Sequence, residues 1–261
     1  MKSRVCDSRW LVFPTLAALV LASSCSRKYE NGLKVVAIYV RAQVQFTNAF
    51  LLKPSGTAST AGAGYKYTPL IIQEILDTNA VVSVPDIFFF EGMATLNGQS
   101  HQQISYIWRL PPRASQPDGL QGVRMTLDSS GLPVIWEVLS DSSGADVIFV
   151  SKSIEAAARR EHGPAMPERQ FAVERSTMDV SRVVVARVIE DGPVPMGPII
   201  YLRAGTFDVS TIICRCMDAQ AKTLTGTAEF NLKADESRSF DGDERKDGSS
   251  LEQRLRLPHV F

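Results

Sequence analysis

Residues 122–139 read Gly-Val-Arg-Met-Thr-Leu-Asp-Ser-Ser-Gly-Leu-Pro-Val-Ile-Trp-Glu-Val-Leu, two apolar-rich segments on either side of the turn-forming residues 128–131. Asp, Ser and Gly tolerate the backbone angles of a tight turn, and such a turn between two apolar segments predicts a β-hairpin. In the second segment Val134, Trp136 and Val138 alternate with their neighbours, which places them on one face of a strand. We therefore expect a hairpin that presents one face to a hydrophobic core.

Working outward from this hairpin, short segments rich in β-branched and aromatic residues predict further strands. The predicted strands are residues 33–40, 86–90, 104–110, 147–150, 182–189, 198–202 and 209–217. Residues 42–52 fit a strand and a helix equally well. The chain is therefore expected to be rich in strands.

Helix signals are fewer. Thr68 and Pro69 are residue types favoured at the N-cap and at the first helical position, and they predict a helix that ends near Asp77. Residues 153–162 predict the clearest helix, since basic side chains complement its C-terminal end and a glycine follows. A short helix is expected near residues 218–224. The whole pattern predicts an α+β (or mixed α/β) fold with two or three helices.

Composition sets the boundaries of the folded part. The chain has 261 residues, of which 44% are hydrophobic, enough to build a core. We expect one globular domain over residues 33–233. Residues 234–261 begin with a highly charged stretch that is nearly free of apolar side chains, and we expect this tail to be largely disordered.

The first 24 residues have the three parts of a secretory signal peptide. Residues 1–9 carry three basic groups and one acidic group, residues 10–22 form an apolar stretch, and the small residues Ser23 and Ser24 follow. A helix needs about 20 apolar residues to cross the hydrocarbon of a bilayer, and this stretch is shorter. We therefore expect an exported chain from which residues 1–24 are removed.

The residues Leu21-Ala-Ser-Ser-Cys25 resemble the lipobox of bacterial lipoproteins. That class prefers leucine three residues before the cysteine, where this chain has Ala22. The resemblance implies cleavage before Cys25, a diacylglycerol on its thiol, and a tether formed by residues 25–32. Ordinary secretory cleavage at the same bond is the alternative, and it would release a soluble periplasmic or secreted protein.

The residue after the cysteine bears on location. In the lipoproteins of Gram-negative bacteria an aspartate at this position favours retention in the inner membrane, and this chain has Ser26 there. The resemblance therefore implies a place in the cell envelope, at the outer membrane if the organism has one. The membrane itself would then be one partner of the protein, through its lipid.

The chain has four cysteines: Cys6, Cys25, Cys214 and Cys216. Cleavage removes the first and a lipid caps the second, which leaves one pair, followed directly by Met217. Side chains two residues apart on a strand share a face, where two sulfurs can bind a soft metal such as Cu(I) or cycle between dithiol and disulfide. A disulfide across one extended residue is awkward, because the Cα atoms approach the limit of about 7 Å. The alternative is that these cysteines are small apolar core residues.

Charge and motifs weigh against other classes of protein. Without residues 1–24 the chain has 25 basic and 27 acidic groups, a formal charge of −2, so a nucleic-acid partner is not expected. His101, His162 and His259 lie in no catalytic motif, which disfavours an enzyme. The sequence favours a membrane-tethered lipoprotein that binds a protein partner or has a structural role in the envelope. A thiol protein acting through Cys214 and Cys216 is the alternative.

Overall fold

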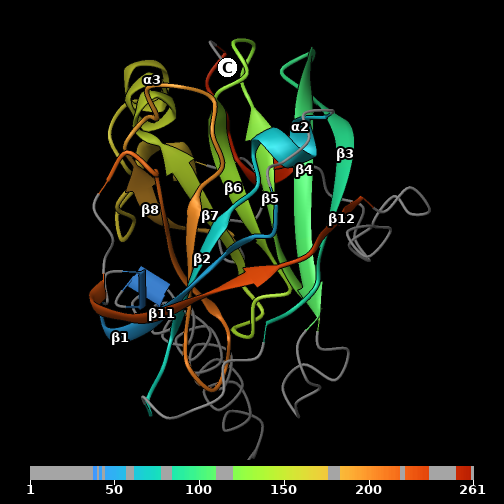
Figure 1. The fold of residues 1–261 in the computed structure, drawn as a ribbon. Helices are drawn as coiled ribbons and strands as arrows, with labels where there is room; N and C mark the ends of the chain where they lie inside the picture. The colour runs from blue at the N-terminus through green and yellow to red at the C-terminus, as the bar shows by residue number, and fades with distance from the viewer. Residues whose placement is uncertain are drawn as a thin grey trace, which may run out of the picture.

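The computed structural model describes residues 38–39, 41–42, 45–56, 62–77, 84–109, 120–175, 183–217, 221–234 and 251–259. Within these ranges the chain is mostly β-structure, arranged as two mixed sheets (Figure 1). The expectation of a strand-rich domain is confirmed. The balance of helix and strand that an α+β or α/β fold implies is not found, because segments expected to be helical are strands.

The smaller sheet has five strands in the order β10-β9-β2-β1-β11. These are β1 (Phe46–Pro54), β2 (Leu70–Glu74), β9 (Ile199–Leu202), β10 (Val209–Ile213) and β11 (Ala221–Phe230). Strand β1 runs parallel to β11 and antiparallel to β2, and β2 runs parallel to β9. The central neighbours lie far apart in the sequence, so long-range pairing builds this sheet.

The larger sheet has seven strands in the order β12-β3-β4-β5-β6-β7-β8. They are β3 (Ile87–Leu96), β4 (Gln99–Arg109), β5 (Leu120–Leu127), β6 (Pro133–Leu139), β7 (Asp146–Ser151), β8 (Val183–Ile189) and β12 (Leu232–Ala234). Strands β3 to β7 form an antiparallel meander, to which β12 and β8 add in parallel at the two edges.

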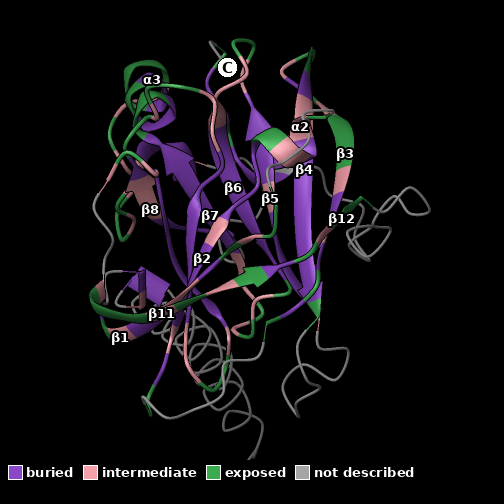
Figure 2. Ribbon diagram, viewed as in Figure 1, coloured by how far each residue is buried: buried purple, intermediate pink, exposed green. Residues whose placement is uncertain are grey.

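The two sheets pack face to face around the main core. The alternation of side chains is clear on β9, where Ile200 and Leu202 enter this core while Ile199 and Tyr201 lie on the opposite face. The larger sheet contributes Tyr106, Trp108, Val123, Met125, Trp136, Val138 and Phe149. Figure 2 shows these layers as mostly buried, whereas β11 is largely exposed.

The sheets meet along both sides. On one side the Arg187 guanidinium of β8 donates a hydrogen bond of 3.3 Å to Thr211 Oγ1 of β10. On the other side a single residue, Asn231, separates β11 of the smaller sheet from β12 of the larger sheet. The chain therefore passes directly from one layer into the other (Figure 1).

The predicted hairpin at residues 122–139 is confirmed, but Val134 does not share the face of Trp136 and Val138: it lies with Ile135 in the cluster on the outer face, near a register shift at Thr126/Leu127. Strands β5 and β6 are antiparallel, with Val123 opposite Val138 and Met125 opposite Trp136. The Asp128 carboxylate accepts hydrogen bonds from the backbone N–H groups of Ser130 and Leu132, which holds the turn in place.

The helix predicted at residues 153–162 is also confirmed. It is α3 (Lys152–His162), and its N-cap is Ser151, whose Oγ accepts a hydrogen bond from the Ile154 N–H. Gly163 has a φ of 84°, the left-handed conformation expected after a helix end. Helix α3, the 3₁₀ helix η1 (Ala172–Glu174) and α4 (Leu251–Arg254) cover the outer face of the larger sheet.

The helix predicted from Thr68 to Asp77 is wrong, because residues 70–74 form strand β2. Thr68 lies after the short helix α2 (Ala63–Lys66) and not before a helix. Its hydroxyl donates to the carbonyl oxygens of Gly64 and Tyr65, so it satisfies a C-terminal end. The β-branched side chains that follow pair between β1 and β9.

Two further expectations are overturned within the described residues. Residues 38–39, expected in a strand, are helical, and Ile38 and Tyr39 are buried in the main core. Residues 221–224, expected in a helix, belong to β11, which pairs with β1 along most of its length. Pairing between distant strands outweighs the local preference in the second case.

The C-terminal tail also differs from expectation. Residues 235–250 lie outside the described residues. Residues 251–259, predicted to belong to a largely disordered tail, begin with α4 and bury Leu251, Leu255 and Leu257 against the larger sheet. The folded part therefore includes the end of the tail as well as residues up to 234.

Candidate functional site

Cys214 and Cys216 lie in a turn and are joined by a disulfide bond. The turn begins where β10 ends, and the Met217 N–H donates a hydrogen bond of 3.1 Å to the Cys214 carbonyl oxygen. This conformation brings the two Cα atoms to 5.1 Å, inside the usual range for a disulfide. The expected extended backbone is wrong at these residues. The objection that the two Cα atoms would lie too far apart for a disulfide therefore no longer holds.

The two sulfur-bearing residues differ in exposure. Cys214 is buried and belongs to the core between the sheets, whereas Cys216 is exposed. The Cys216 N–H donates to Cys214 Sγ at 3.1 Å. This N–H is positioned to stabilise negative charge on the Cys214 sulfur if the bridge opens.

Arg215 lies between the two cysteines in the sequence and anchors the turn. Its guanidinium donates a hydrogen bond to the Thr68 carbonyl oxygen, at the start of β2. Burial lowers the pKa of the Arg215 guanidinium, while the nearby Tyr106 hydroxyl acts in the opposite direction. A partly buried cation therefore ties the turn to the chain just before β2, the central strand of the smaller sheet.

A small hollow, open to solvent, adjoins the disulfide. It is lined by Pro133 and Trp136 of β6, by Cys214 and Arg215, and by Glu190, Gly192, Val194, Met196, Gly197 and Pro198 of the segment between β8 and β9. The wall is mixed, with an aromatic ring, apolar side chains and two charged groups.

Gly197 fixes the position of this wall. A Cβ atom built on Gly197 would lie 2.1 Å from the Tyr67 carbonyl oxygen and 2.4 Å from that of Thr68. Only glycine lets the segment approach the backbone at the start of β2 so closely.

Of the two methionines considered as further ligands of this pair, Met217 lies apart from it. Met217 packs against the opposite face of the smaller sheet, beside Ile213 and Tyr201, whereas Cys214 lies in the core between the sheets. Met196 lines the hollow. Within the described ranges, no group of three or more His, Cys, Asp or Glu side chains is placed to hold a metal ion. The described residues therefore bring the cysteines together without the predicted methionine ligand.

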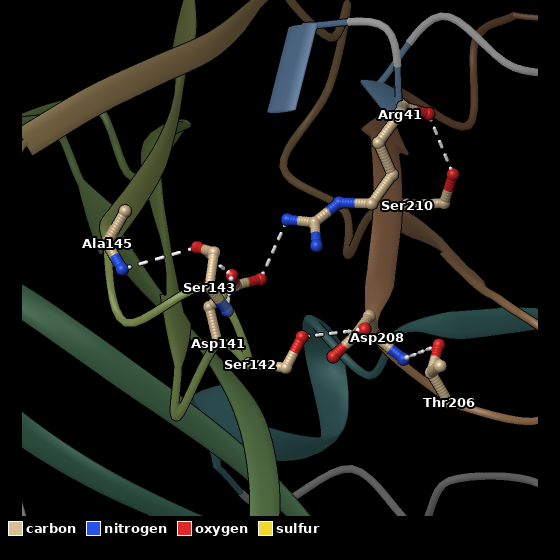
Figure 3. A network of polar contacts seen from close by, with 8 residues as sticks. All are labelled: Arg41, Asp141, Ser142, Ser143, Ala145, Thr206, Asp208 and Ser210. Atoms are coloured by element: carbon tan, nitrogen blue, oxygen red, sulfur yellow. Dashed lines mark hydrogen bonds and ion pairs between the residues drawn. The ribbon is translucent and has the colours of Figure 1, made fainter. Parts of the chain in front are cut away.

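A second polar cluster, which sequence patterns did not reveal, joins three distant segments (Figure 3). Arg41 donates a hydrogen bond of 2.8 Å to Asp141 Oδ2, and the Arg41 carbonyl oxygen accepts one of 2.9 Å from Ser210 Oγ. Ser142 Oγ donates to Asp208 Oδ2 at 2.8 Å. The cluster therefore fastens residue 41 to the β6–β7 loop and to the start of β10, and it joins the β6–β7 loop to Asp208 of the β9–β10 loop.

The two carboxylates of this cluster are satisfied to different degrees. Asp141 accepts from Arg41 and, through its other oxygen, from the backbone N–H and hydroxyl of Ser143. Asp208 is buried, and its Oδ1 has no hydrogen-bond partner among the described residues. The separations of 100 and 169 residues between bonded partners explain why no local motif announced the cluster.

The predicted lipid site at Cys25, the predicted signal peptide and the tether at residues 25–32 lie outside the described residues. Where the structure describes the chain, no helix has both the length and the apolar character needed to cross a membrane.

Comparisons with protein-family models, with curated proteins and with solved structures gave no match. The function is therefore argued from the residues and geometry of this chain.

Proposed function

We propose that this chain is an exported lipoprotein of the bacterial cell envelope, anchored through Cys25, whose folded part acts by binding. The observation that carries the proposal is the apolar stretch at residues 10–22, followed by small residues and then a cysteine. The disulfide between Cys214 and Cys216 supports export, because such bonds persist mainly in oxidising compartments. Because residue 26 is Ser and not Asp, we propose that the anchored protein lies at the outer membrane in a cell that has one.

Two buried acidic side chains serve a structural role in the folded part. Glu155 accepts hydrogen bonds from the backbone N–H groups of Ala172 and Val173, at 2.9 and 3.1 Å. Glu174 accepts from the N–H groups of Phe171 and Val185, each at 3.2 Å. Both carboxylates are committed to holding backbone in place, as in a scaffold.

The Arg41 cluster sets the distance of the folded part from the proposed anchor. Sixteen residues of chain lead from Cys25 to Arg41. A fully extended chain covers at most about 3.5 Å per residue, so the two residues can lie no more than about 55 Å apart. The β6–β7 loop and β10, which hold Arg41, would then lie within this distance of the membrane surface.

Expression in a Gram-negative host tests the anchor. The mature chain should begin at Cys25, carry the mass of a diacylglycerol and fractionate with membranes. A Cys25→Ser variant should lose the acyl mass, whereas Cys6→Ser, altered in the segment to be removed, should behave as the wild type. A soluble mature chain with an unmodified Cys25 would refute the anchor, and a chain that stays alone under gentle crosslinking of membranes would argue against binding.

A second candidate function is disulfide exchange, favoured by the asymmetry between exposed Cys216 and buried Cys214. A thiolate of an incoming dithiol would attack Cys216 Sγ, break the disulfide and release Cys214 as a thiolate beside the Cys216 N–H. The second thiolate of the substrate would then displace Cys216. Two electrons and two protons pass from the dithiol to the cysteine pair, and the substrate leaves as a disulfide. Cu(I) binding would need the same reduction first.

Thiol reactivity in the folded protein tests this second function. In a Cys214→Ser variant the remaining Cys216 should react quickly with an alkylating reagent. In the matched Cys216→Ser variant the remaining Cys214 should react slowly, because it is buried. If the wild-type pair resists a small dithiol until the protein is denatured, and no Cu(I) binds to the reduced protein, the pair is structural.

A further inference from the structure

The last described segment, residues 251–259, occupies the outer face of the larger sheet as a short peptide would. It enters as α4, and Leu251, Leu255 and Leu257 share a buried cluster with Ile135 of β6 and with residues of β3, β7, β8 and α3. Leu255 is 1% exposed. The segment is therefore held to the larger sheet by its side chains. Within the described residues its backbone is not a strand of either sheet.

A buried charge gives the docking its specificity. Arg254 donates a hydrogen bond of 2.6 Å to Glu137 Oε1, and the two side chains are 7% and 1% exposed. Asp146 lies on the same guanidinium at 3.9 Å, and Arg124 lies 3.8 Å from the other oxygen of Glu137. Removing Arg254 would leave Glu137 buried without its closest partner, which is a large penalty.

Polar contacts at the end of the segment fix its direction. Asn97 Nδ2, at the turn between β3 and β4, donates 2.8 Å to the Pro258 carbonyl oxygen. The His259 N–H donates 2.6 Å to Glu161 Oε2 of α3, and the His259 ring contacts the same carboxylate. We name the surface formed by Ile135, Glu137, Asn97, Glu161 and the apolar residues around them the tail groove.

The sequence between β12 and this segment is highly charged. Sixteen residues, 235–250, connect β12 with Leu251, and Phe240 is their one large apolar side chain. The docking is argued from the contacts of residues 251–259 alone, which join this segment to β3, β6 and α3.

We propose that the tail groove is a peptide-binding site, filled here by residues 251–259 of the same chain and open to the same segment from a second copy. The second copy is the occupant to expect, because residues 251–259 are the one sequence whose fit this structure displays. Sixteen residues separate β12 from Leu251. At no more than about 3.5 Å per residue they can span at most about 55 Å, which bounds how far the segment could reach toward a neighbour. The inference concerns only the folded part and does not depend on the lipid at Cys25.

Peptide exchange in the intact fold tests the site. A protease site is inserted between residues 242 and 243 of the full chain, and the folded protein is then cut. A fluorescent peptide of residues 249–261 should replace the cut segment and show raised anisotropy, whereas uncut protein should bind it far more weakly. The Arg254→Ala peptide should compete roughly 100-fold less well. The matched Arg256→Ala peptide should compete like the parent, because Arg256 is exposed.

A mixing experiment tests the second copy. In a full-length Glu137→Gln variant, Arg254 loses its closest charged partner and keeps Asp146 at 3.9 Å, so the segment should leave its own groove more readily than in the wild type. Mixed with the cut protein, this variant should form a one-to-one complex by light scattering, and excess peptide should dissolve it. If the peptide fails to exchange, or binds equally well without Arg254, the site is refuted. If the peptide binds but no complex forms, the second copy is not its occupant.

Discussion

Arg254, in the last described helix, donates a hydrogen bond to Glu137 at the centre of the larger sheet, 117 residues earlier in the chain. Both side chains are almost fully buried. This pair joins the end of the chain to β6, the strand whose other face contributes Trp136 and Val138 to the main core.

Substitution of Arg254 by Met should lower the free energy of unfolding by about 3 kcal/mol, the lower end of the cost of breaking a buried ion pair. Arg124, 3.8 Å from Glu137, should keep the loss at that end of the range. Urea denaturation measures the change. The matched Arg256→Met variant should lie within about 0.5 kcal/mol of the wild type, because Arg256 is exposed. Equal losses for both variants would contradict the role of the pair.

The two carboxylates near Arg41 should respond differently to neutralisation. Asp141→Asn should cost about 2 kcal/mol, because Asp141 accepts hydrogen bonds from Arg41 and from both donors of Ser143. Asp208→Asn should be close to neutral, because one oxygen of this buried carboxylate lacks a partner among the described residues. Urea denaturation of both variants provides the comparison, and a larger loss for Asp208→Asn would reverse our reading of the cluster.

Gly197→Ala should destabilise the fold by about 2 kcal/mol or more, since the new Cβ would overlap the Tyr67 and Thr68 carbonyl oxygens and force the backbone apart. Gly192→Ala is the matched control. The nearest atoms to its Cβ lie 3.4 and 3.5 Å away, which is ordinary contact. Thermal unfolding of the two variants measures the difference. If Gly197→Ala melts with the wild type, the segment lining the hollow is not held as described.

The contact between α3 and His259 should weaken in acid. The hydrogen bond from the His259 backbone N–H, and then its ring, hold the pKa of Glu161 below its ordinary value of 4.5. A carboxylate with a lowered pKa stabilises the folded state above the unfolded value, and this contribution is lost as the pH falls through the folded value. The stability difference between wild type and Glu161→Gln should therefore be constant at neutral pH and shrink below about pH 4.5. Unfolding measured from pH 7 to pH 3 checks this, and a difference independent of pH would contradict it.

Local signals predicted the elements that local interactions stabilise. The hairpin at residues 122–139 and helix α3 were both predicted, because turn residues and caps act over four residues or fewer. Thr68 and Pro69 misled because the same residue types serve at the end of α2 as at the start of a helix. Residues 70–74 form a strand because they pair with β1 and β9, and a short stretch of sequence around β2 does not include both of these partners.

The sequence identified the two cysteines of the candidate site but not the backbone conformation or the residues around them. Sequence singled out Cys214 and Cys216, and the structure places both in a turn where a strand was expected. The hollow beside them depends on Trp136 and on the segment ending at Pro198, which come from separate parts of the chain. The docking of residues 251–259 was missed, because a charged stretch precedes it and three leucines over nine residues are a weak pattern.

Asn231 has a mechanical consequence. Because β11 hydrogen-bonds to β1 and β12 to β3 with one residue between them, the layers cannot slide past each other without rupturing one of those ladders. Shear applied to either sheet is transmitted to the other along continuous covalent chain. When the domain is pulled, the two sheets should therefore unfold together in a single event and not one after the other.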